Sequence, residues 1–305
     1  MCIRDRSQSD RGAADIFCLP GPPGELQPMF EREVLPHLRL PPGHIVLTRL
    51  AHVVGIAEAD CVTKLGDLTR RDVARLDGEP RSLVGITASG GILTLRMRCE
   101  GQTGAAAAAA LLDEAEARAR GTLGEHLFAI GTGPGAEQLA ATVIAHLKRE
   151  RQTLATAESC TGGMLGQIIT AIPGASGAYV GGFITYANAQ KVTLGVEAAA
   201  IEAHGAVAAE VASQMAARAL ERTGASHALA ITGVAGPDGG SEAKPVGTVY
   251  IARASKGASV SSRRFHFTGN RDDVRRRASV TALAMLYFHM RPPASGPPRL
   301  LWEVG

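Results

Sequence analysis

The sequence predicts an α/β protein with a mixed sheet, preceded by a small α+β module. After residue 136, short apolar runs alternate with helical patterns, as in sheets that are covered by helices. Two of these runs, 154–157 and 228–231, end abruptly in small polar residues and glycines, which is typical of strands that end at a site. Two later runs, 246–252 and 260–267, are placed to form an antiparallel pair.

The bulk composition is that of an ordinary globular protein. The chain has 305 residues, which corresponds to roughly two domains. Hydrophobic residues make up 45% and charged residues 20%, and the formal net charge is +3. This charge is too small and too dispersed to indicate a nucleic-acid partner. No apolar run approaches the roughly 18 residues of a membrane span, so no membrane partner is expected.

The five cysteines are scattered and form neither a CxxC pair nor a Cys/His ligand pair. They therefore predict neither a disulfide framework nor a zinc site, and the sequence indicates no metal and no cofactor. The first residues carry charges but lack the apolar segment of a signal peptide. The expected compartment is a reducing cytoplasm.

The N-terminal part of the chain predicts few elements. Residues 1–12 differ in composition from the rest and are expected to be disordered or a non-native leader. The apolar run 16–19, a Pro/Gly turn and the amphipathic stretch 29–38 predict a strand, a turn and a helix. These elements are too few to form a core, so residues 13–43 are interpreted as the end of a larger domain.

Residues 44–130 predict the small α+β module. Its expected elements are a strand at 45–54, a helix at 56–68, a hairpin of strands at 83–87 and 92–97, a helix at 105–120 and a strand at 127–130. The glycine-rich segment 131–135 follows. Its glycines do not fit G-x-G-x-x-G and no Gly-Lys-Ser/Thr follows, so it is interpreted as a linker.

Residues 136–290 predict the third unit, and residues 291–305 a loose tail. The helix at 207–222 is strongly amphipathic and ends at Gly224, a residue that favours the left-handed conformation of helix ends. The other expected elements are helices at 139–147, 164–169 and 272–290 and strands at 154–157, 178–186, 228–231, 246–252 and 260–267.

The stretch 157–163, of sequence AESCTGG, holds the candidate nucleophiles Ser159, Cys160 and Thr161. A serine hydroxyl needs an adjacent base at neutral pH, whereas a thiol at a helix N-terminus can have a lowered pKa. The alternative is structural: a helix cap and tightly packed glycines, with Cys160 buried and Glu158 capping the next helix or pairing with an arginine. The stretch alone supports the two interpretations about equally.

The base that a serine would require has few candidates in this unit. Its histidines lie mostly within helical or strand patterns, and none has a neighbouring carboxylate as in a catalytic triad. A desolvated lysine is the other route, because burial lowers the pKa of the amine and leaves a neutral base. Tyr186 and Lys191 are the natural candidates, although lysines are more commonly found on the surface.

Two loops could bind an anion through backbone N–H groups. The first is Thr161-Gly162-Gly163, and the second runs from Gly233 to Gly240. Arg271 opens the last helix and could add a guanidinium to a phosphate. Taken alone, the arginines of this helix are more typical of a solvated helix face.

A series of ordered motifs resembles the C-terminal domain of the CinA family. The motifs are AESCTGG at 157–163, GFITY at 182–186 with Lys191, LGV at 194–196, GAV at 205–207, ITGVAGP at 231–237, KPVGTV at 244–249 and Arg271. The resemblance implies a three-layer α/β domain with a mixed sheet. It also implies a nicotinamide mononucleotide deamidase of pyridine nucleotide salvage, which converts nicotinamide mononucleotide and water to nicotinate mononucleotide and ammonia without a metal.

The resemblance also implies roles for individual residues. Ser159 becomes the nucleophile and Tyr186 with Lys191 the activating pair, and which of the two accepts the first proton is left open. The residues expected to bind the nucleotide substrate are Thr161, Gly162, Gly163, Thr232, Gly233, Gly236 and Arg271, the last of them at its phosphate.

The N-terminal parts of the chain resemble other regions of the same family. Residues 19–31 are similar to the end of its molybdopterin-biosynthesis-like domain, and motifs within 44–130 are similar to its connecting domain. Most of the first domain is missing, so the ADP-ribose pyrophosphatase activity of some family members is expected to be absent. The truncated domain would leave an apolar surface that is either covered by a partner, as in a homo-oligomer, or a liability.

Two other functions fit the same residues. The loops could bind a nucleotide without turning it over, in a non-catalytic, competence-associated protein. Alternatively, the same serine mechanism could act on another small carboxamide. Ammonia release from nicotinamide mononucleotide distinguishes the deamidase from the non-catalytic protein. A panel of amides with and without a 5′-phosphate distinguishes it from an amidase that acts on another carboxamide.

Overall fold

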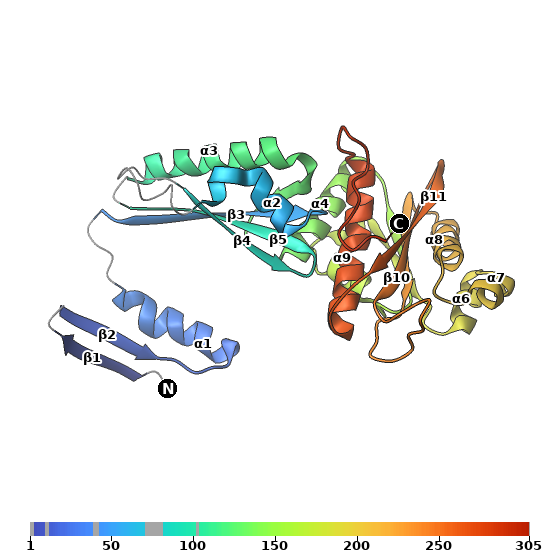
Figure 1. Cartoon of the computed structure of the whole chain (residues 1–305), viewed down its shortest axis with the longest axis horizontal. Coiled ribbons are helices and arrows are strands. Elements are labelled where there is room, and N and C mark those ends of the chain that lie inside the picture. Colours follow the sequence, from blue (N-terminus) through green and yellow to red (C-terminus); the bar gives the residue numbers. More distant parts are fainter. Residues whose placement is uncertain (1–2, 10–11, 39–42, 71–81, 102–103, 305) are drawn as a thin grey trace.

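The computed structural model describes residues 3–9, 12–38, 43–70, 82–101 and 104–304. Within these ranges the strands form three sheets (Figure 1): a two-stranded sheet of β1 and β2, a four-stranded sheet in the order β4-β5-β3-β6, and a five-stranded sheet in the order β11-β10-β9-β7-β8. None of the described helices combines the length and hydrophobicity that crossing a membrane requires.

The N-terminal unit is a hairpin followed by short helices. Strand β1 (Ile3–Ser9) pairs antiparallel with β2 (Gly12–Cys18), and α1 (Pro23–Met29) continues into a π-helical segment at Phe30–Val34 and a 3-10 turn at Leu35–His37. Of the stretch 1–12, expected to be disordered or a non-native leader, residues 3–9 and 12 pair in this hairpin, and residues 1–2 and 10–11 lie outside the described residues. A hairpin satisfies backbone N–H and C=O groups by pairing, and composition alone does not reveal such pairing.

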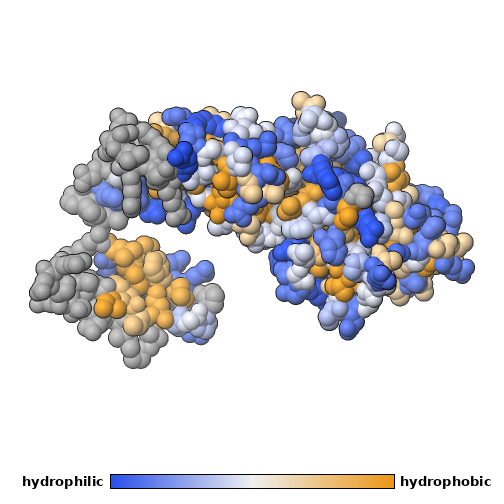
Figure 2. Space-filling model, in the orientation of Figure 1, coloured by the Kyte–Doolittle hydropathy of each residue, from blue (hydrophilic) through white to orange (hydrophobic). Residues whose placement is uncertain are grey.

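Hydrophobic side chains gather on the face of this unit that Figure 2 shows. Four large apolar side chains are exposed here: Ile16, Phe30, Leu35 and Leu38.

The second unit is an antiparallel sheet covered by two helices on one face. Its strands are β3 (Ile45–Val54), β4 (Leu83–Ser89), β5 (Ile92–Gly101) and β6 (Leu127–Ile130), and its helices are α2 (Glu58–Leu65) and α3 (Ala105–Leu123), with 3-10 turns at Gly66–Thr69 and Gly124–His126. The predicted hairpin is confirmed, because Ser89 pairs with Ile92 across the β4–β5 turn. Buried residues of both helices and of the sheet form one core.

The third unit contains the mixed sheet. Its strands are β7 (Leu154–Glu158), β8 (Tyr179–Ile184), β9 (His227–Gly233), β10 (Thr248–Ser255) and β11 (Ala258–His266). Its helices are α4 (Gly135–Arg149), α5 (Met164–Thr170), α6 (Asn188–Leu194), α7 (Ala198–His204), α8 (Ala209–Thr223) and α9 (Arg271–Met290), with a 3-10 turn at Ala175–Gly177. Strand β7 is parallel to both β8 and β9, whereas β10 is antiparallel to β9 and β11. The predicted three-layer α/β fold with a mixed sheet is confirmed.

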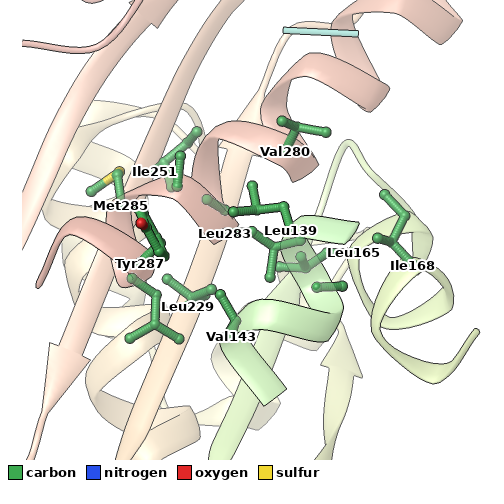
Figure 3. Packing of buried hydrophobic residues seen from close by; sticks show 14 of the residues in the cluster. Leu139, Val143, Leu165, Ile168, Leu229, Ile251, Val280, Leu283, Met285 and Tyr287 are labelled. Carbon is green, nitrogen blue, oxygen red and sulfur yellow. The ribbon is translucent and has the colours of Figure 1, made fainter. Parts of the chain in front are cut away.

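The two faces of this sheet are built from side chains of different size. Helices α4, α5 and α9 cover one face with large residues, and in Figure 3 Leu139 of α4 and Leu283 of α9 lie close together above the sheet. Helices α6 and α8 cover the other face, where the strands contribute only alanines to the buried cluster. These alanines are Ala155, Ala157, Ala228, Ala230, Ala252 and Ala254. Small side chains let a helix approach the sheet closely.

The C-terminal tail is docked, which corrects the expectation of a loose segment at 291–305. Leu300 is buried, and the guanidinium of Arg277 lies 5.0 Å from the centre of the Trp302 ring. Glu303 forms a β-bridge with Phe265 of β11 and an ion pair with Arg263. The proline-rich composition suggested a loose tail, but two large apolar side chains provide enough buried surface to hold it.

Candidate active site

Ser159 lies where three parallel strands end together. Strand β7 is fully buried between β8 and β9, and because the three are parallel, their carboxyl ends meet at one end of the sheet. The Ser159 N–H donates to the carbonyl of Ile231, 2.9 Å away, and the Thr185 N–H donates to the carbonyl of Glu158, 2.7 Å away. These bonds tie the chain segments that leave β7, β8 and β9 to one another.

Lys191 is buried directly against Ser159. Its side chain is 1% exposed, and its Nζ lies 3.1 Å from the Oγ of Ser159. Nζ also donates to the carbonyl oxygens of Thr185, at 2.9 Å, and Tyr186, at 3.2 Å. Within the described ranges no carboxylate pairs with this amine. Burial without a counter-charge lowers the pKa of Lys191.

The Ser159 hydroxyl and the two carbonyl groups surround this amine, which donates to all three when it is protonated. A neutral amine has two N–H donors and one lone pair. With the two N–H groups directed at Thr185 and Tyr186, the lone pair is left for the third neighbour, the Ser159 hydroxyl. In this state the hydroxyl donates to Nζ, and the arrangement can take a proton from Ser159, which is the function of a general base.

Cys160 is not set up as a competing nucleophile. Burial raises the pKa of its thiol to about 12, and desolvation is the largest cause. The thiolate is the reactive form of cysteine, so the thiol stays protonated at neutral pH. The structure thus places Cys160 as the buried structural residue that the sequence left as an alternative.

Glu158 caps the helix that follows Ser159. Its side chain is 2% exposed and accepts hydrogen bonds from the N–H groups of Gly163 and Leu165, both at 3.0 Å, and of Gly166 at 2.8 Å. The expected capping role is confirmed. No arginine pairs with this carboxylate among the described residues.

Tyr186 contacts Lys191 through its backbone carbonyl and Arg271 through its hydroxyl. Its carbonyl accepts from Lys191, whereas its hydroxyl accepts from Arg271 Nη2 at 3.1 Å. The side chain is 60% exposed. Arg271 also donates from Nη1 to the carbonyl of Gly236, 2.8 Å away, and so links helix α9 to the loops after β8 and β9. The hydroxyl of Tyr186 makes no hydrogen bond to Ser159 or Lys191.

The predicted loop residues fall into two groups. The N–H groups of Gly162 and Gly163 are already used, by the Ser159 carbonyl and by Glu158. In the described part of the chain, the N–H groups of Cys160 and Thr161 have no hydrogen-bond acceptor on another residue. The buried Thr161 hydroxyl likewise has no partner.

The loop after β9 begins beside the same end of the sheet. The Thr232 hydroxyl donates to the carbonyl of Ala206, 2.8 Å away, and ties β9 to the segment before α8. A Cβ at Gly233 would approach the carbonyl oxygen of Thr248 to 2.8 Å, so close packing requires glycine there. Gly236 has a φ of +82°, a backbone conformation that favours glycine, and its carbonyl accepts from Arg271.

Some residues of the site escaped the sequence analysis. Thr185 holds Lys191 through its backbone carbonyl, and no sequence pattern marks a backbone acceptor. Arg275 donates to the Thr161 carbonyl from Nη2, at 2.9 Å, and from Nε. In the sequence, Arg275 stands out only as one of several arginines on the last helix. In the described ranges no group of three or more His, Cys, Asp or Glu residues is placed to hold a metal ion.

Comparison with known protein families matches most of the chain. A family model described as the CinA C-terminal domain matches residues 136–290, and one described as the damage-inducible protein CinA KH domain matches residues 48–129. A CinA-like protein of Desulfovibrio desulfuricans is 39% identical over 282 residues, and one of Parasynechococcus marenigrum is 38% identical over 275. These alignments cover 90% and 89% of this chain. The chain spans 62% of the length of either relative.

Solved structures match the C-terminal part of such proteins. The competence/damage inducible protein CihA from Agrobacterium tumefaciens is 38% identical, with a TM-score of 0.51 over 53% of this chain and 99% of that chain. A CinA superfamily protein from Klebsiella pneumoniae is 33% identical, with a TM-score of 0.50 over 52% of this chain and 99% of that chain. By the match of its residues 136–290 to the family's C-terminal domain, the chain belongs to the CinA family.

Proposed function

We propose that the chain is an amidohydrolase that converts nicotinamide mononucleotide and water to nicotinate mononucleotide and ammonia. The observation that carries the proposal is the contact between Ser159 Oγ and the buried Nζ of Lys191, 3.1 Å apart. A serine beside a lysine with a lowered pKa is a recognised nucleophile–base pair for acyl transfer. Membership of the CinA family supports the substrate, through the resemblance of the motifs around this pair.

The first half of the reaction transfers the nicotinoyl group to the serine. Lys191 Nζ takes the hydroxyl proton of Ser159 while Oγ attacks the carboxamide carbon. The C–N bond then breaks, and Lys191 returns the proton to the leaving nitrogen, which departs as ammonia. We assign the first proton transfer to Lys191, because the Tyr186 hydroxyl contacts Arg271.

The second half releases the acid. Lys191, neutral again, takes a proton from a water molecule, and the resulting hydroxide attacks the ester carbon. The ester bond to Oγ breaks, Ser159 recovers its proton from Lys191, and nicotinate mononucleotide leaves. One base therefore serves both halves of the reaction.

The nucleotide is proposed to lie across the ends of β7 and β9. Arg271 would pair with its 5′-phosphate in exchange for the neutral Tyr186 and Gly236 oxygens that it now contacts, because a guanidinium binds a charged phosphate more strongly. Thr161 and Thr232, with the glycines of the two loops, would surround the ribose and the pyridine ring.

Ammonia release from nicotinamide mononucleotide by the purified chain tests the proposal. Wild-type protein is expected to release one ammonia for each nicotinate mononucleotide formed, and Ser159→Ala to release none above background. A chain that binds the nucleotide without releasing ammonia would instead support the non-catalytic, competence-associated alternative. Turnover of amides that lack a 5′-phosphate at the same rate would contradict the role of Arg271 and favour an amidase of broader range.

A further inference from the structure

The carboxylate of Glu158 lies one residue before the nucleophile but faces away from it. It contacts the start of α5, whereas the side chain of Ser159 contacts Lys191 on α6. Glu158 therefore takes no part in the proposed proton transfers. Its burial still needs an explanation, because a carboxylate buried at 2% exposure is costly unless its oxygens are fully bonded.

Three backbone N–H groups supply those bonds. Gly163 and Leu165 donate to Oε2 and Gly166 donates to Oε1, so the carboxylate holds three residues of the segment 163–166. The Gly162 N–H closes the adjoining turn on the carbonyl of Ser159, at 3.0 Å. The turn between the nucleophile and α5 is thereby held at both ends.

This bonding decides which amides remain available. The N–H groups of Gly162, Gly163, Leu165 and Gly166 are all occupied, whereas those of Cys160 and Thr161 have no acceptor on any other described residue. An oxyanion that forms on the acyl group of Ser159 needs fixed N–H donors next to that residue. The two unoccupied amides are the nearest ones along the chain.

The backbone of Glu158 also reaches the base. Its carbonyl accepts from the N–H of Thr185, and the carbonyl of Thr185 accepts from Lys191 Nζ. Glu158 thus fixes the turn through its side chain. Through its main chain it also fixes Thr185, whose carbonyl holds Lys191. We propose that Glu158 is a positioning residue, which holds the Ser159 turn so that the Cys160 and Thr161 amides stabilise the oxyanion. The inference rests on the serine chemistry of the proposed function.

Glu158→Gln is the decisive variant. Its amide has nearly the same shape but presents an NH₂ donor to one of the three backbone N–H groups, so at least one bond is replaced by a repulsive contact. We expect kcat for ammonia release to fall about 100-fold, because small misplacements of reacting groups cost that much. KM should change by less than about threefold, since the groups that hold the phosphate are untouched.

A matched control separates this role from general loss of buried polar contacts. Tyr179 of β8 shares a hydrogen bond with Thr156 of β7, the strand that carries Glu158, at 2.7 Å, and its hydroxyl lies beside Gly166 without bonding the turn. Tyr179→Phe should lower the melting temperature as Glu158→Gln does, yet keep kcat within about twofold. If Glu158→Gln does not fold, Glu158→Asp keeps the charge with a shorter reach and should lower kcat about 10-fold.

A second readout does not depend on the natural substrate. A fluorophosphonate reacts with an activated serine: the Oγ–P bond forms, the P–F bond breaks, fluoride leaves and Lys191 takes the proton. The phosphoryl oxygen then carries the charge that the carboxamide oxygen would carry. We expect Glu158→Gln to slow labelling of Ser159, located by mass spectrometry, by the same factor as kcat.

Each outcome bears on one of the two proposals. Labelling of Glu158→Gln, or of Glu158→Asp, at the wild-type rate would overturn the positioning role, as would a wild-type chain that does not label at Ser159. Wild-type protein that labels at Ser159 but releases no ammonia would overturn the proposed substrate, while the labelling rates of the variants would still decide the role of Glu158.

Discussion

Two serines at opposite ends of the same sheet each contact a buried nitrogen base. At the carboxyl ends of β7–β9, Ser159 lies 3.1 Å from Lys191 Nζ. At the other end, Ser255 Oγ lies 2.8 Å from Nδ1 of His227. The two serines are 7% and 5% exposed, so neither burial nor distance distinguishes them.

The difference lies in what else each pair contacts. His227 Nε2 donates to the Gln152 side-chain oxygen at 3.0 Å, and Ser255 accepts from Arg253 Nη1 at 2.6 Å, so every polar group of that pair is bonded within β9, β10 and the segment before β7. Around Ser159 the strands end, and two amides lack an acceptor on any other residue that the structure describes. A serine–base contact becomes a candidate site only where the surrounding backbone leaves groups free for a substrate.

The largest expected difference between the two ends is in catalysis by the serines themselves. Ser159→Ala should lower kcat for ammonia release about 10³-fold or more, because no other described group replaces the nucleophile. Circular dichroism should show an unchanged fold. Retained turnover in this variant would show that Ser159 is not the nucleophile. The two ends of the sheet would then not differ in catalysis by their serines.

Replacing the base at the carboxyl end should separate activity from stability. Lys191→Met should lower kcat by about 10²- to 10⁴-fold, the usual contribution of a general base. It should change the free energy of unfolding by no more than about 1–3 kcal/mol, because the Thr185 and Tyr186 carbonyls lose their donor while a buried amine without a counter-charge is removed. Steady-state kinetics and urea denaturation measure the two effects. A near-normal rate would assign Lys191 a purely structural role.

The rate should depend on pH through the lysine. A general base must be unprotonated, so kcat/KM should rise about tenfold per pH unit until pH passes the pKa of Lys191 and then level off. Burial lowers this pKa from its ordinary value of 10.5, so the plateau should begin below that pH. A profile that keeps rising beyond pH 10.5 would contradict the lowered pKa of Lys191.

The histidine end should instead govern stability in acid. Burial lowers the pKa of His227 to about 4, and His289, Arg253 and His146 lower it further by charge repulsion. The unfolded chain binds this proton first, so stability is complete above about pH 6.5 and is lost as pH falls toward 4, by at most about 3 kcal/mol. Denaturation at pH 7 and pH 4 measures the loss. It should be smaller in His227→Asn, and an equal loss would assign it to other groups.

The smallest effect is expected from the second serine. Ser255→Ala leaves His227 Nδ1 and one Arg253 N–H without their partner, which should cost about 1–3 kcal/mol of unfolding free energy. Ammonia release should stay within about twofold of wild type. A large loss of activity would show that the two ends of the sheet are coupled.

The fold was largely predictable because apolar runs mark its strands, α4 and α8 are amphipathic, and the alanine-rich α3 has a high helix propensity. Strands β3–β11 and helices α3, α4, α8 and α9 lie within a few residues of their predicted positions. Helices α6 and α7 were missed. The stretch Asn188–Leu194 is polar and short, so it shows little periodicity, and α7 has no buried residue that would mark a face.

The candidate site was predictable only in its residue types. Ser159 and Lys191 stood out because a serine needs a base, but their contact depends on α6, which the sequence pattern did not predict. Tyr186 was expected to act through its hydroxyl, whereas the structure brings its carbonyl to Lys191. Backbone groups of this kind take part in any sequence, so only three-dimensional structure shows which of them are used.

The alanine-lined face under α8 limits which amino-acid substitutions such a protein can accept during evolution. Where the packed residues are already Ala155, Ala157, Ala228 and Ala230, almost every replacement adds volume that the close helix cannot accept. On the α9 face, a loss of volume in one side chain can be matched by a gain in its neighbour. Substitutions should therefore accumulate mainly on the face covered by α9. The face covered by α6 and α8, which carries Lys191, should change most slowly.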